Sequence, residues 1–256
     1  MDAILSAVGV GKSLGGTEII RDLNFSARKG EFISVVGPSG CGKTTLLMCL
    51  AGLRRADAGQ VWFEGRPISA PPDGMALIFQ DYSRSLLPWR RNVDNVIFGM
   101  RRLRGLDRAT RRARAMEMLA AVGLQGFENH YPWQVSGGMQ QRIAIARALV
   151  GQPHLLLLDE PLAAVDAQTR AEIQDLLLTL ARQFQQTCLL VTHDVDEAIY
   201  LADRVFVLSA RPTRVIKEIP IALGRPRDQI ATKADPVFLH HREEILTRIK
   251  SMRHKN

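Results

Sequence analysis

The 256-residue chain alternates between short apolar runs and longer segments in which apolar residues recur every three or four positions. Continuous apolar runs are typical of buried parallel strands, and the three- to four-residue spacing is typical of helices packed on one face. The runs are at 32–36, 75–79, 155–158 and 188–191; helical spacing is clearest at 46–50, 143–150 and 173–184. The alternation predicts an α/β fold with a mostly parallel sheet.

The first thirty residues have a different pattern. Short apolar stretches from Ile4 to Ile33 are broken by turn signals at Gly15-Gly16 and Lys29-Gly30, which predicts antiparallel β-structure. A hairpin is predicted further on, where the stretches 60–63 and 67–68 flank a Glu-Gly-Arg turn. We therefore expect an antiparallel β subdomain beside the parallel sheet.

A helical pattern fills the middle of the chain, over about 84–150. Asp107 is a plausible N-cap and Gly123 a stop, and the residues expected on one apolar face are Met116, Leu119, Ala120 and Val122. We expect a main domain over 1–230 that contains this α-helical insertion. A helical tail over 231–256 would follow, starting at Asp235-Pro236 and burying Phe238, Ile245, Leu246 and Ile249.

A glycine-rich loop joins the strand at 32–36 to the helical pattern after it. Its residues are Gly37, Pro38, Ser39, Gly40, Cys41, Gly42, Lys43, Thr44 and Thr45. Glycines let a backbone wrap its N–H groups around an anion, and the helix that follows adds its positive dipole end. The G-x-x-x-x-G-K-T spacing between a strand and a helix predicts a P-loop that binds a nucleoside triphosphate, rather than an ordinary turn. Lys43 would reach the β- and γ-phosphates, and the Thr44 hydroxyl would bind Mg²⁺.

Three further strand ends carry polar groups. Asp159 and Glu160 follow the run 155–158, Gln80 follows the run 75–79, and His193 follows the run 188–191. In open α/β sheets ligands gather at the carboxyl ends of strands, so these side chains are placed near the phosphates. Asp159 can hold the metal or its water shell, Glu160 can polarise the attacking water, and His193 can sense the γ-phosphate. A lone Gln or His at a strand end is more often structural, and spacing does not decide the role of Gln80.

A second anion site is predicted at Ser136, Gly137 and Gly138, which open a helix with apolar residues at Ile143, Ala146 and Leu149. By itself the motif also fits an ordinary serine-capped helix. Asp166 is expected to cap or precede the next helix.

Composition narrows the class of protein. The formal charge of +8 fits nucleic acid, an acidic membrane surface or a well-solvated protein, but the arginines are spread over separate segments without interleaved aromatics, which favours the last two. No apolar run approaches the roughly 18 residues of a membrane span, and no targeting segment is visible. Three scattered cysteines give neither a metal site nor a disulfide framework, so we expect a cytosolic protein.

One apolar segment stands out within the helical insertion. Leu86-Leu87-Pro88-Trp89 lies in a stretch that otherwise looks exposed. It could receive a helix of a partner protein, or it could pack locally onto the insertion's own core. The segment alone favours neither.

One set of motifs, taken in chain order, resembles the ATP-binding subunits of ABC transporters. The set consists of 37–45, Gln80, 136–142, 155–160, Asp166 and His193. The stretch 79–89 and the tail 235–238 are similar to the nitrate, sulfonate and taurine importer group. The resemblance implies ATP and Mg²⁺ as cofactors, with Thr44, Gln80 and Asp159 around the metal and Glu160 and His193 as catalytic residues.

The resemblance also implies partners. A second copy would face the first head to tail and complete its ATP site with Ser136, Gly137, Gly138 and Asp166. Leu87, Pro88 and Trp89 would contact transmembrane permease subunits at the cytoplasmic face of the membrane, and a solute-binding protein would act indirectly. No nucleic-acid partner is expected.

The sequence departs from the family pattern in three features. Leu14 stands where an adenine-stacking aromatic is usual, the signature has Val135 and Met139 at positions usually held by Leu and Gln, and 163–166 reads Ala-Ala-Val-Asp. A soluble ABC-type ATPase acting on nucleic acid or ribosomes is the alternative function, but it predicts paired ATPase domains or a long coiled-coil insertion. A P-loop kinase or GTPase would leave Ser136 to Gly138 and His193 without a use.

Overall fold

The computed structural model describes residues 3–81, 85–163 and 165–253. The chain divides into two compact units: Met1–Pro72 with Gln185–Asn256 forms the first, and Asp73–Phe184 forms the second. No helix within the described residues is long and apolar enough to cross a membrane.

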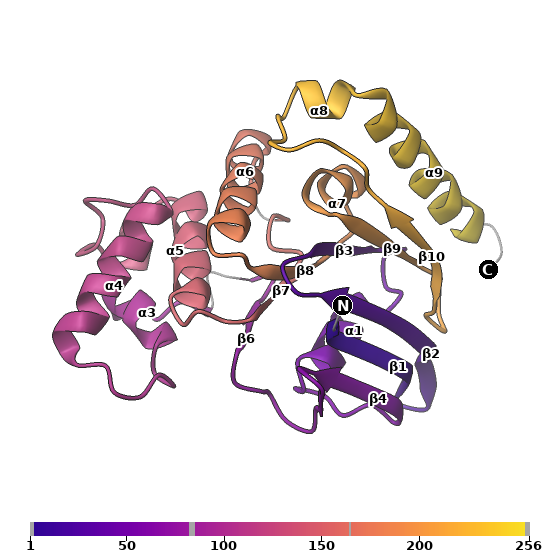
Figure 1. Cartoon of the computed structure of the whole chain (residues 1–256), viewed down its shortest axis with the longest axis horizontal. Coiled ribbons are helices and arrows are strands. Elements are labelled where there is room, and N and C mark those ends of the chain that lie inside the picture. Colours follow the sequence, from indigo (N-terminus) through magenta and orange to yellow (C-terminus); the bar gives the residue numbers. More distant parts are fainter. Residues whose placement is uncertain (1–2, 82–84, 164, 254–256) are drawn as a thin grey trace. The chain divides into compact units, whose positions relative to one another are not determined.

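An antiparallel sheet forms one part of the first unit. Its strands are β1 (Ala3–Leu14), β2 (Thr17–Arg28), β4 (Ala58–Phe63) and β5 (Arg66–Pro67), in the order β2-β1-β4-β5 (Figure 1). Gly15 and Gly16 both have positive φ in the β1–β2 turn, and Trp62 pairs with Pro67 in the β4–β5 hairpin. The predicted turns and hairpin are confirmed. The strands before residue 28 are longer than the short ones expected, because β1 pairs along its length with both β2 and β4.

The first unit also contains the strands that carry the P-loop. β3 (Phe32–Val36) lies between β8 (Thr187–Thr192) and β9 (Arg204–Leu208) and is parallel to both, while β10 (Val215–Pro220) is antiparallel to β9. Every residue of β3, β8 and β9 is buried, as their continuous apolar runs predict. Two helices follow these strands, α1 (Lys43–Leu50) after β3 and α7 (Val195–Leu201) after β8.

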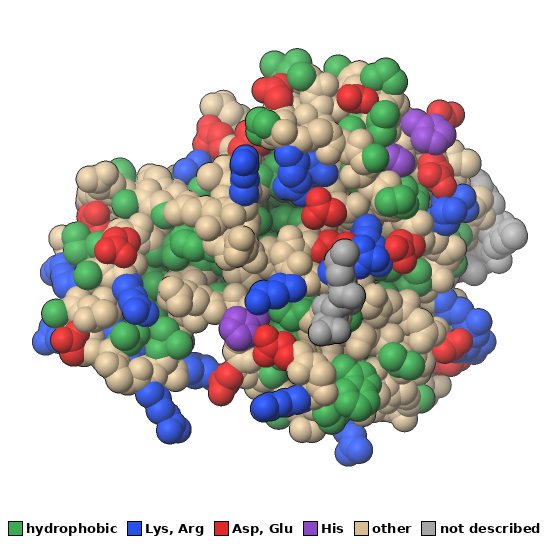
Figure 2. All heavy atoms as spheres, in the orientation of Figure 1, with side chains coloured by type: hydrophobic (Ala, Val, Ile, Leu, Met, Phe, Trp, Pro, Cys, Tyr) green, Lys and Arg blue, Asp and Glu red, His purple; other side chains and the backbone are tan. Residues whose placement is uncertain are grey.

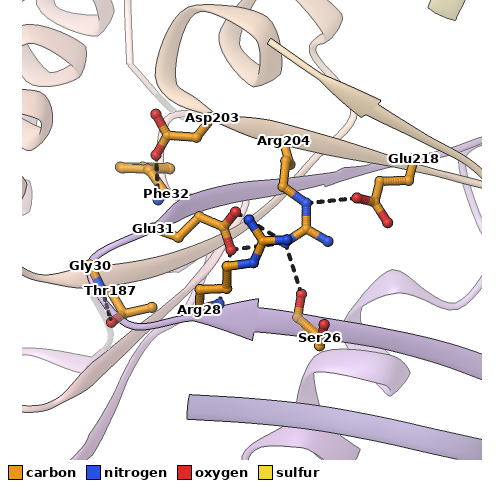
Figure 3. A network of polar contacts seen from close by, with 9 residues as sticks. All are labelled: Ser26, Arg28, Gly30, Glu31, Phe32, Thr187, Asp203, Arg204 and Glu218. Carbon is orange, nitrogen blue, oxygen red and sulfur yellow. Dashed lines mark hydrogen bonds and ion pairs between the residues drawn. The ribbon is translucent and has the colours of Figure 1, made fainter. Parts of the chain in front are cut away.

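An arginine network holds the amino ends of β3 and β9 together (Figure 3). Arg204 Nη1 donates to both carboxylate oxygens of Glu31, at 3.0 and 2.9 Å, and to the Ser26 carbonyl. Arg204 Nε donates to Glu218 at 2.8 Å, and the guanidinium lies over the Phe206 ring. Burial lowers the pKa of Arg204, but the bonds to Glu218 and Glu31 outweigh this effect, and the pKa is raised overall. The network therefore fixes these strands at the ends opposite to the P-loop.

The C-terminal segment of the first unit forms α8 (Ala231–Ala234) and α9 (Pro236–Arg253), and α9 packs against α7. The predicted start at Asp235-Pro236 is confirmed, and Phe238, Ile245 and Ile249 are buried. Leu246 is 36% exposed, so its prediction as a core residue was wrong. It follows Ile245 directly and is rotated away from the buried face.

The second unit pairs β6 (Met75–Ile78) in parallel with β7 (Leu155–Asp159). Its helices are α3 (Asn92–Gly99), α4 (Arg108–Ala121), α5 (Gly137–Leu149) and α6 (Ala167–Gln183), with the 3₁₀ helix η1 (Pro132–Gln134) before α5. α3, α4 and α5 pack against one another. The predicted helical insertion is thus present as helices in this unit.

The predicted face of α4 was partly wrong. Leu119 and Val122 are buried as expected, but Met116 and Ala120 are exposed. The buried stripe instead runs through Ala115, Met118, Leu119 and Val122, which have the i, i+3, i+4, i+7 spacing of a single helix face.

Candidate functional site

The P-loop is shaped by glycines that no other residue could replace without strain. Gly40 and Gly42 have φ values of +75° and +112°, and a Cβ on Gly42 would lie 2.5 Å from the Ile19 side chain. Ser39 and Gly40 are exposed at the outside of the loop. Gly42 is also the N-cap of α1 and has no side chain to accept from the first-turn amides. Those amides are suited to bind an anion.

Lys43 lies beneath the loop that it belongs to. Its Nζ donates to the carbonyl oxygens of Gly37 and Pro38, each at 3.2 Å, and only 6% of the residue is exposed. Thr44, the next residue, is exposed. The Cys41 thiol is buried and its pKa is raised chiefly by desolvation, so it is a packing residue rather than a nucleophile.

A cavity of about 470 Å³ opens beside the loop. It is lined by Pro38, Ser39, Gly40, Cys41, Ala210, Arg211 and Met252. Ala210 and Arg211 follow β9, and Met252 belongs to the last turn of α9, so the C-terminal helix reaches the P-loop.

His193 leaves the sheet next to the P-loop. Val36 pairs with Thr192, so Gly37 and His193 emerge at the same edge of two neighbouring strands. His193 is exposed. Asp194 caps α7 by accepting from the amides of Asp196 and Glu197, at 2.9 and 3.1 Å.

The Thr192 hydroxyl fixes the backbone around His193. It donates to the buried Glu197 carboxylate and accepts from the Asp194 amide at 3.1 Å. The strand end that presents the histidine is therefore held from both sides.

Gln80, Asp159 and Glu160 share one edge of the second unit. Ile78 pairs with Leu158 in parallel strands, so the residues that follow both strands leave in the same direction. Asp159 is 4% exposed at the end of β7, whereas Gln80 is exposed. Glu160 has a φ of +44°, a left-handed conformation that is unfavourable for a residue with a Cβ. Strain of this kind is typical of functional sites.

The turn after Glu160 is held by a residue of α5. The Gln141 side-chain amide is fully buried and donates to the Pro161 carbonyl. The helix that begins at the serine-glycine motif is thereby linked directly to the loop that carries the acidic pair.

Ser136 and Asp166 begin two neighbouring helices. Ser136 Oγ accepts from the Met139 amide at 3.3 Å, and Asp166 accepts from the Thr169 amide and hydroxyl at 2.9 and 2.7 Å. These bonds lower the pKa of Asp166. A Cβ on Gly138 would lie 2.5 Å from the Thr169 methyl group, so the two helix starts pack closely. The predicted caps are confirmed.

From Ser85 onward, the segment that follows Gln80 is held by hydrogen bonds to side chains of α3 and α5. Arg147, near the end of α5, donates to the carbonyl and hydroxyl oxygens of Ser85 at 2.6 and 2.7 Å. Asn95 is fully buried; it accepts from the Leu87 amide at 2.8 Å and donates to the Leu87 and Arg90 carbonyls. Tyr82, Ser83 and Arg84 lie outside the described residues.

These contacts divide the apolar segment. Leu86 is buried, as the local-packing interpretation predicts, and Leu87 is half-buried. Pro88 is exposed, and Trp89 leaves 72% of its surface exposed. The segment is thus anchored at Leu86 and leaves Trp89 at the surface.

Many basic residues have structural roles. Arg111 donates to the carbonyls of Met100, Leu103 and Leu106, and Arg142 pairs with Glu172 at 3.0 Å. On the face in Figure 2, Lys and Arg side chains lie in small groups among polar and acidic ones, not in one continuous basic patch. On this face the pattern is typical of a solvated surface.

The structure thus gathers the predicted residues into separate groups. The first unit brings the P-loop next to His193. The second unit brings Gln80 next to Asp159 and Glu160, and Ser136 to Gly138 next to Asp166. Sequence reasoning missed Asn95 and Arg147 and gave no role to Gln141, which lies within 136–142. All three hold these loops, and the signal for each was a polar residue within an apolar helical pattern.

The loop, its strand and the following helix define a P-loop ATPase, and comparisons with known proteins specify the family. A family model described as ABC transporter matches residues 20–163. The taurine import ATP-binding protein TauB of Yersinia pestis is 41% identical over 254 residues, which cover 98% of each chain. TauB of Escherichia coli K12 is 42% identical over 243 residues, covering 93% of this chain and 94% of its own.

Solved structures agree with this. The ATP-binding cassette MJ0796, in a dimeric post-hydrolysis state bound to ADP and Pi, has a TM-score of 0.74 and 31% identity and covers 85% of this chain and 98% of its own. CbiO1 of Clostridium perfringens has a TM-score of 0.80 and 26% identity, with 99% and 100% covered. The chain belongs to the ABC transporter family. It is an ATP-binding, ATP-hydrolysing subunit. The predicted resemblance to ABC transporter ATP-binding subunits, the predicted importer group and the predicted α/β fold class are confirmed.

Proposed function

We propose that the chain binds ATP with Mg²⁺ and hydrolyses it to power import of taurine, a sulfonate, nitrate or a similar small solute. The solute class rests on the taurine import proteins that match nearly the whole chain. The observation that carries the activity is the strained Glu160, directly after the buried Asp159 at the end of β7. A soluble ATPase acting on nucleic acid is not favoured by these relatives.

The residues present fit a magnesium nucleotide. Gly37 to Thr45 would hold the phosphates through backbone amides and Lys43. Thr44, Gln80 and Asp159 offer a hydroxyl, an amide oxygen and a carboxylate, all of which are oxygen ligands suited to Mg²⁺. Bound there, the cation would neutralise charge on the phosphates.

Glu160 would accept a proton from the attacking water, and His193 would hold the geometry around the γ-phosphate. The Thr192 and Asp194 bonds support the second role, because they fix the backbone on either side of His193.

A second copy would supply the remaining contacts. Ser136, Gly137, Gly138 and Asp166 would approach the nucleotide bound to the partner chain, which explains a second anion site in a chain with one P-loop. The dimeric state of MJ0796 supports this arrangement.

Leu87, Pro88 and Trp89 would contact permease subunits at the cytoplasmic face of the membrane, where the chain would lie as a peripheral subunit. A solute-binding protein would deliver the solute to the permease from the other side.

Glu160→Gln tests the catalytic role. The amide cannot accept the proton from water, so turnover should fall by about 10²- to 10⁴-fold while ATP binding persists. We expect the variant to form an ATP-dependent dimer, measured by light scattering, and to release little phosphate. Near-normal hydrolysis would show that another group activates the water.

A further inference from the structure

A stacked aromatic pair, the half-buried Tyr131 and the exposed Trp133, lies directly before the serine-glycine motif. Trp133 leaves 68% of its surface exposed, and its ring is stacked on that of Tyr131, with centroids 5.8 Å apart and planes 14° from parallel. Tyr131 supports one face of the indole, and Trp133 is one of the two most exposed aromatic residues in the described part of the chain. Such exposed, pre-formed aromatic surfaces are typical of binding contacts.

The turn that carries Trp133 is closed at both ends. The Tyr131 amide donates to the Gln134 side chain at 2.8 Å, and the Gln134 amide donates to the Tyr131 carbonyl at 2.9 Å. Pro132 is buried and anchors η1. Because the backbone is fixed, the turn that carries the indole loses little further conformational freedom on binding.

Trp133 precedes Ser136 by three residues, so the two Cα atoms lie within about 10 Å of each other. If Ser136 approaches the terminal phosphate of a nucleotide, the indole is close enough to reach the ribose or base of that nucleotide. The chain's own P-loop offers the base little: Leu14 is aliphatic, and none of the seven residues lining the described cavity beside the loop has an aromatic ring.

We propose that Trp133, supported by Tyr131, stacks on the adenine base of the ATP bound to the second copy's P-loop. This proposal rests on the proposed dimer, and it makes Trp133 a determinant of nucleotide specificity in trans. Every purine or pyrimidine base has a π-face, but the larger purine stacks more strongly, so the site should favour ATP over CTP.

The test uses the Glu160→Gln background and follows ATP- and CTP-driven dimerisation by light scattering. Replacing the indole in Trp133→Ala should raise the ATP concentration needed for dimerisation by about five- to a hundredfold, the range for losing one base–aromatic stack. The CTP requirement should change much less, and Trp133→Phe should retain most of the ATP preference. Trp62→Ala removes a half-exposed tryptophan of β4 and should leave the ATP and CTP concentrations needed for dimerisation unchanged.

Monomer binding separates a stacking role from a folding defect. Because Trp133 acts on the partner's nucleotide, Trp133→Ala should bind ATP to its own P-loop with parental affinity. A variant with Trp133 as its only tryptophan, made with Trp62→Phe and Trp89→Phe, should show emission that changes on ATP-driven dimerisation and is shielded from acrylamide.

Three results would overturn the proposal. An unchanged ATP requirement in Trp133→Ala would show that the indole contributes nothing. An equal loss with ATP and CTP would show that it contacts the partner's protein surface instead of the base. Failure of the Glu160→Gln parent to dimerise with ATP, with Trp133 in place, would overturn the proposed dimer together with this inference.

Discussion

Gly138 has a hydrogen atom where every other residue type has a Cβ, and this difference decides how closely the serine-glycine motif can pack. Its missing Cβ makes room for the Thr169 methyl group, and Thr169 in turn binds Asp166. Gly138, Asp166 and Thr169 are therefore packed into one small cluster. Gly138 and Asp166 are proposed to contact the partner's nucleotide, and Thr169 holds Asp166. A change at this position should act through geometry and not through charge.

Gly138→Ala should disrupt this cluster, because the new Cβ would lie 2.5 Å from the Thr169 side chain. We expect a destabilisation of about 1–3 kcal/mol, measured by urea unfolding, and a matching loss of ATP-driven dimerisation. Gly138→Ala combined with Thr169→Ser should recover both, because serine lacks the methyl group but keeps the hydroxyl bonded to Asp166. No recovery in the double variant would show that the clash is not the cause. Gly224→Ala, at a position with open space, is the control.

At the scale of elements, the ends of β3 and β9 away from the nucleotide depend on Arg204. Its side chain and that of Glu31 are only 11% and 10% exposed, so the pair is shielded from water. Removing one member leaves the other charge buried without its main partner.

Arg204→Met should therefore destabilise the protein by roughly 2–4 kcal/mol, measured by urea unfolding. Arg204→Met with Glu31→Met should recover part of this loss, because the stranded carboxylate is also removed. The control is Arg248→Met, whose ion pair with Glu244 on α9 is more exposed and should contribute less than about 1 kcal/mol. Equal effects of Arg204→Met and Arg248→Met would contradict the role given to the network.

The sequence predicts the elements of the site well because the signals are local. A strand ending in Asp159-Glu160, a loop with the spacing of 37–45 and caps at Ser136 and Asp166 are each decided by neighbours within a few residues. Contacts between distant segments leave no such signal. The Arg147–Ser85 bonds, the Asn95 contacts and the approach of Met252 to the P-loop all join residues that only the fold brings together.

The faces of helices were predicted less well than their positions. On α4 the spacing fits two overlapping stripes, and the packing of α3 and α5 selects the one through Ala115 and Met118. At Leu246 an apolar side chain is simply left on the surface, which is common in soluble proteins.

At the scale of the whole molecule, the segment around Trp89 is the feature best suited to transmit a movement. α5 begins at the serine-glycine motif and holds Ser85 through Arg147 near its other end. A displacement of the motif on ATP binding would therefore be carried along one rigid helix to the segment that presents Trp89.

Replacing Leu87 and Trp89 by Ser should weaken association with permease subunits without changing the fold, because Trp89 is exposed and Leu87 is half-buried. We expect the variant to lose co-purification with membrane proteins while keeping ATP-driven dimerisation. Unchanged co-purification would remove this segment from the contact surface. Trp62→Ser is the matched control.

We propose that each ATP site is completed by a second chain, and a mixed dimer of two damaged variants tests this arrangement. Lys43→Ala damages the P-loop and Ser136→Ala damages the serine-glycine motif, so neither variant alone should hydrolyse ATP well. When the two variants are mixed, each mixed dimer has two ATP sites. If sites are built in trans, one site combines the intact P-loop of the Ser136→Ala chain with the intact serine-glycine motif of the Lys43→Ala chain, and the other site combines the two damaged motifs. Random pairing makes about half of the dimers mixed, so ATPase activity should recover to roughly a quarter of the parental rate. No recovery on mixing would contradict the claim, because a site built within one chain stays damaged in every partner.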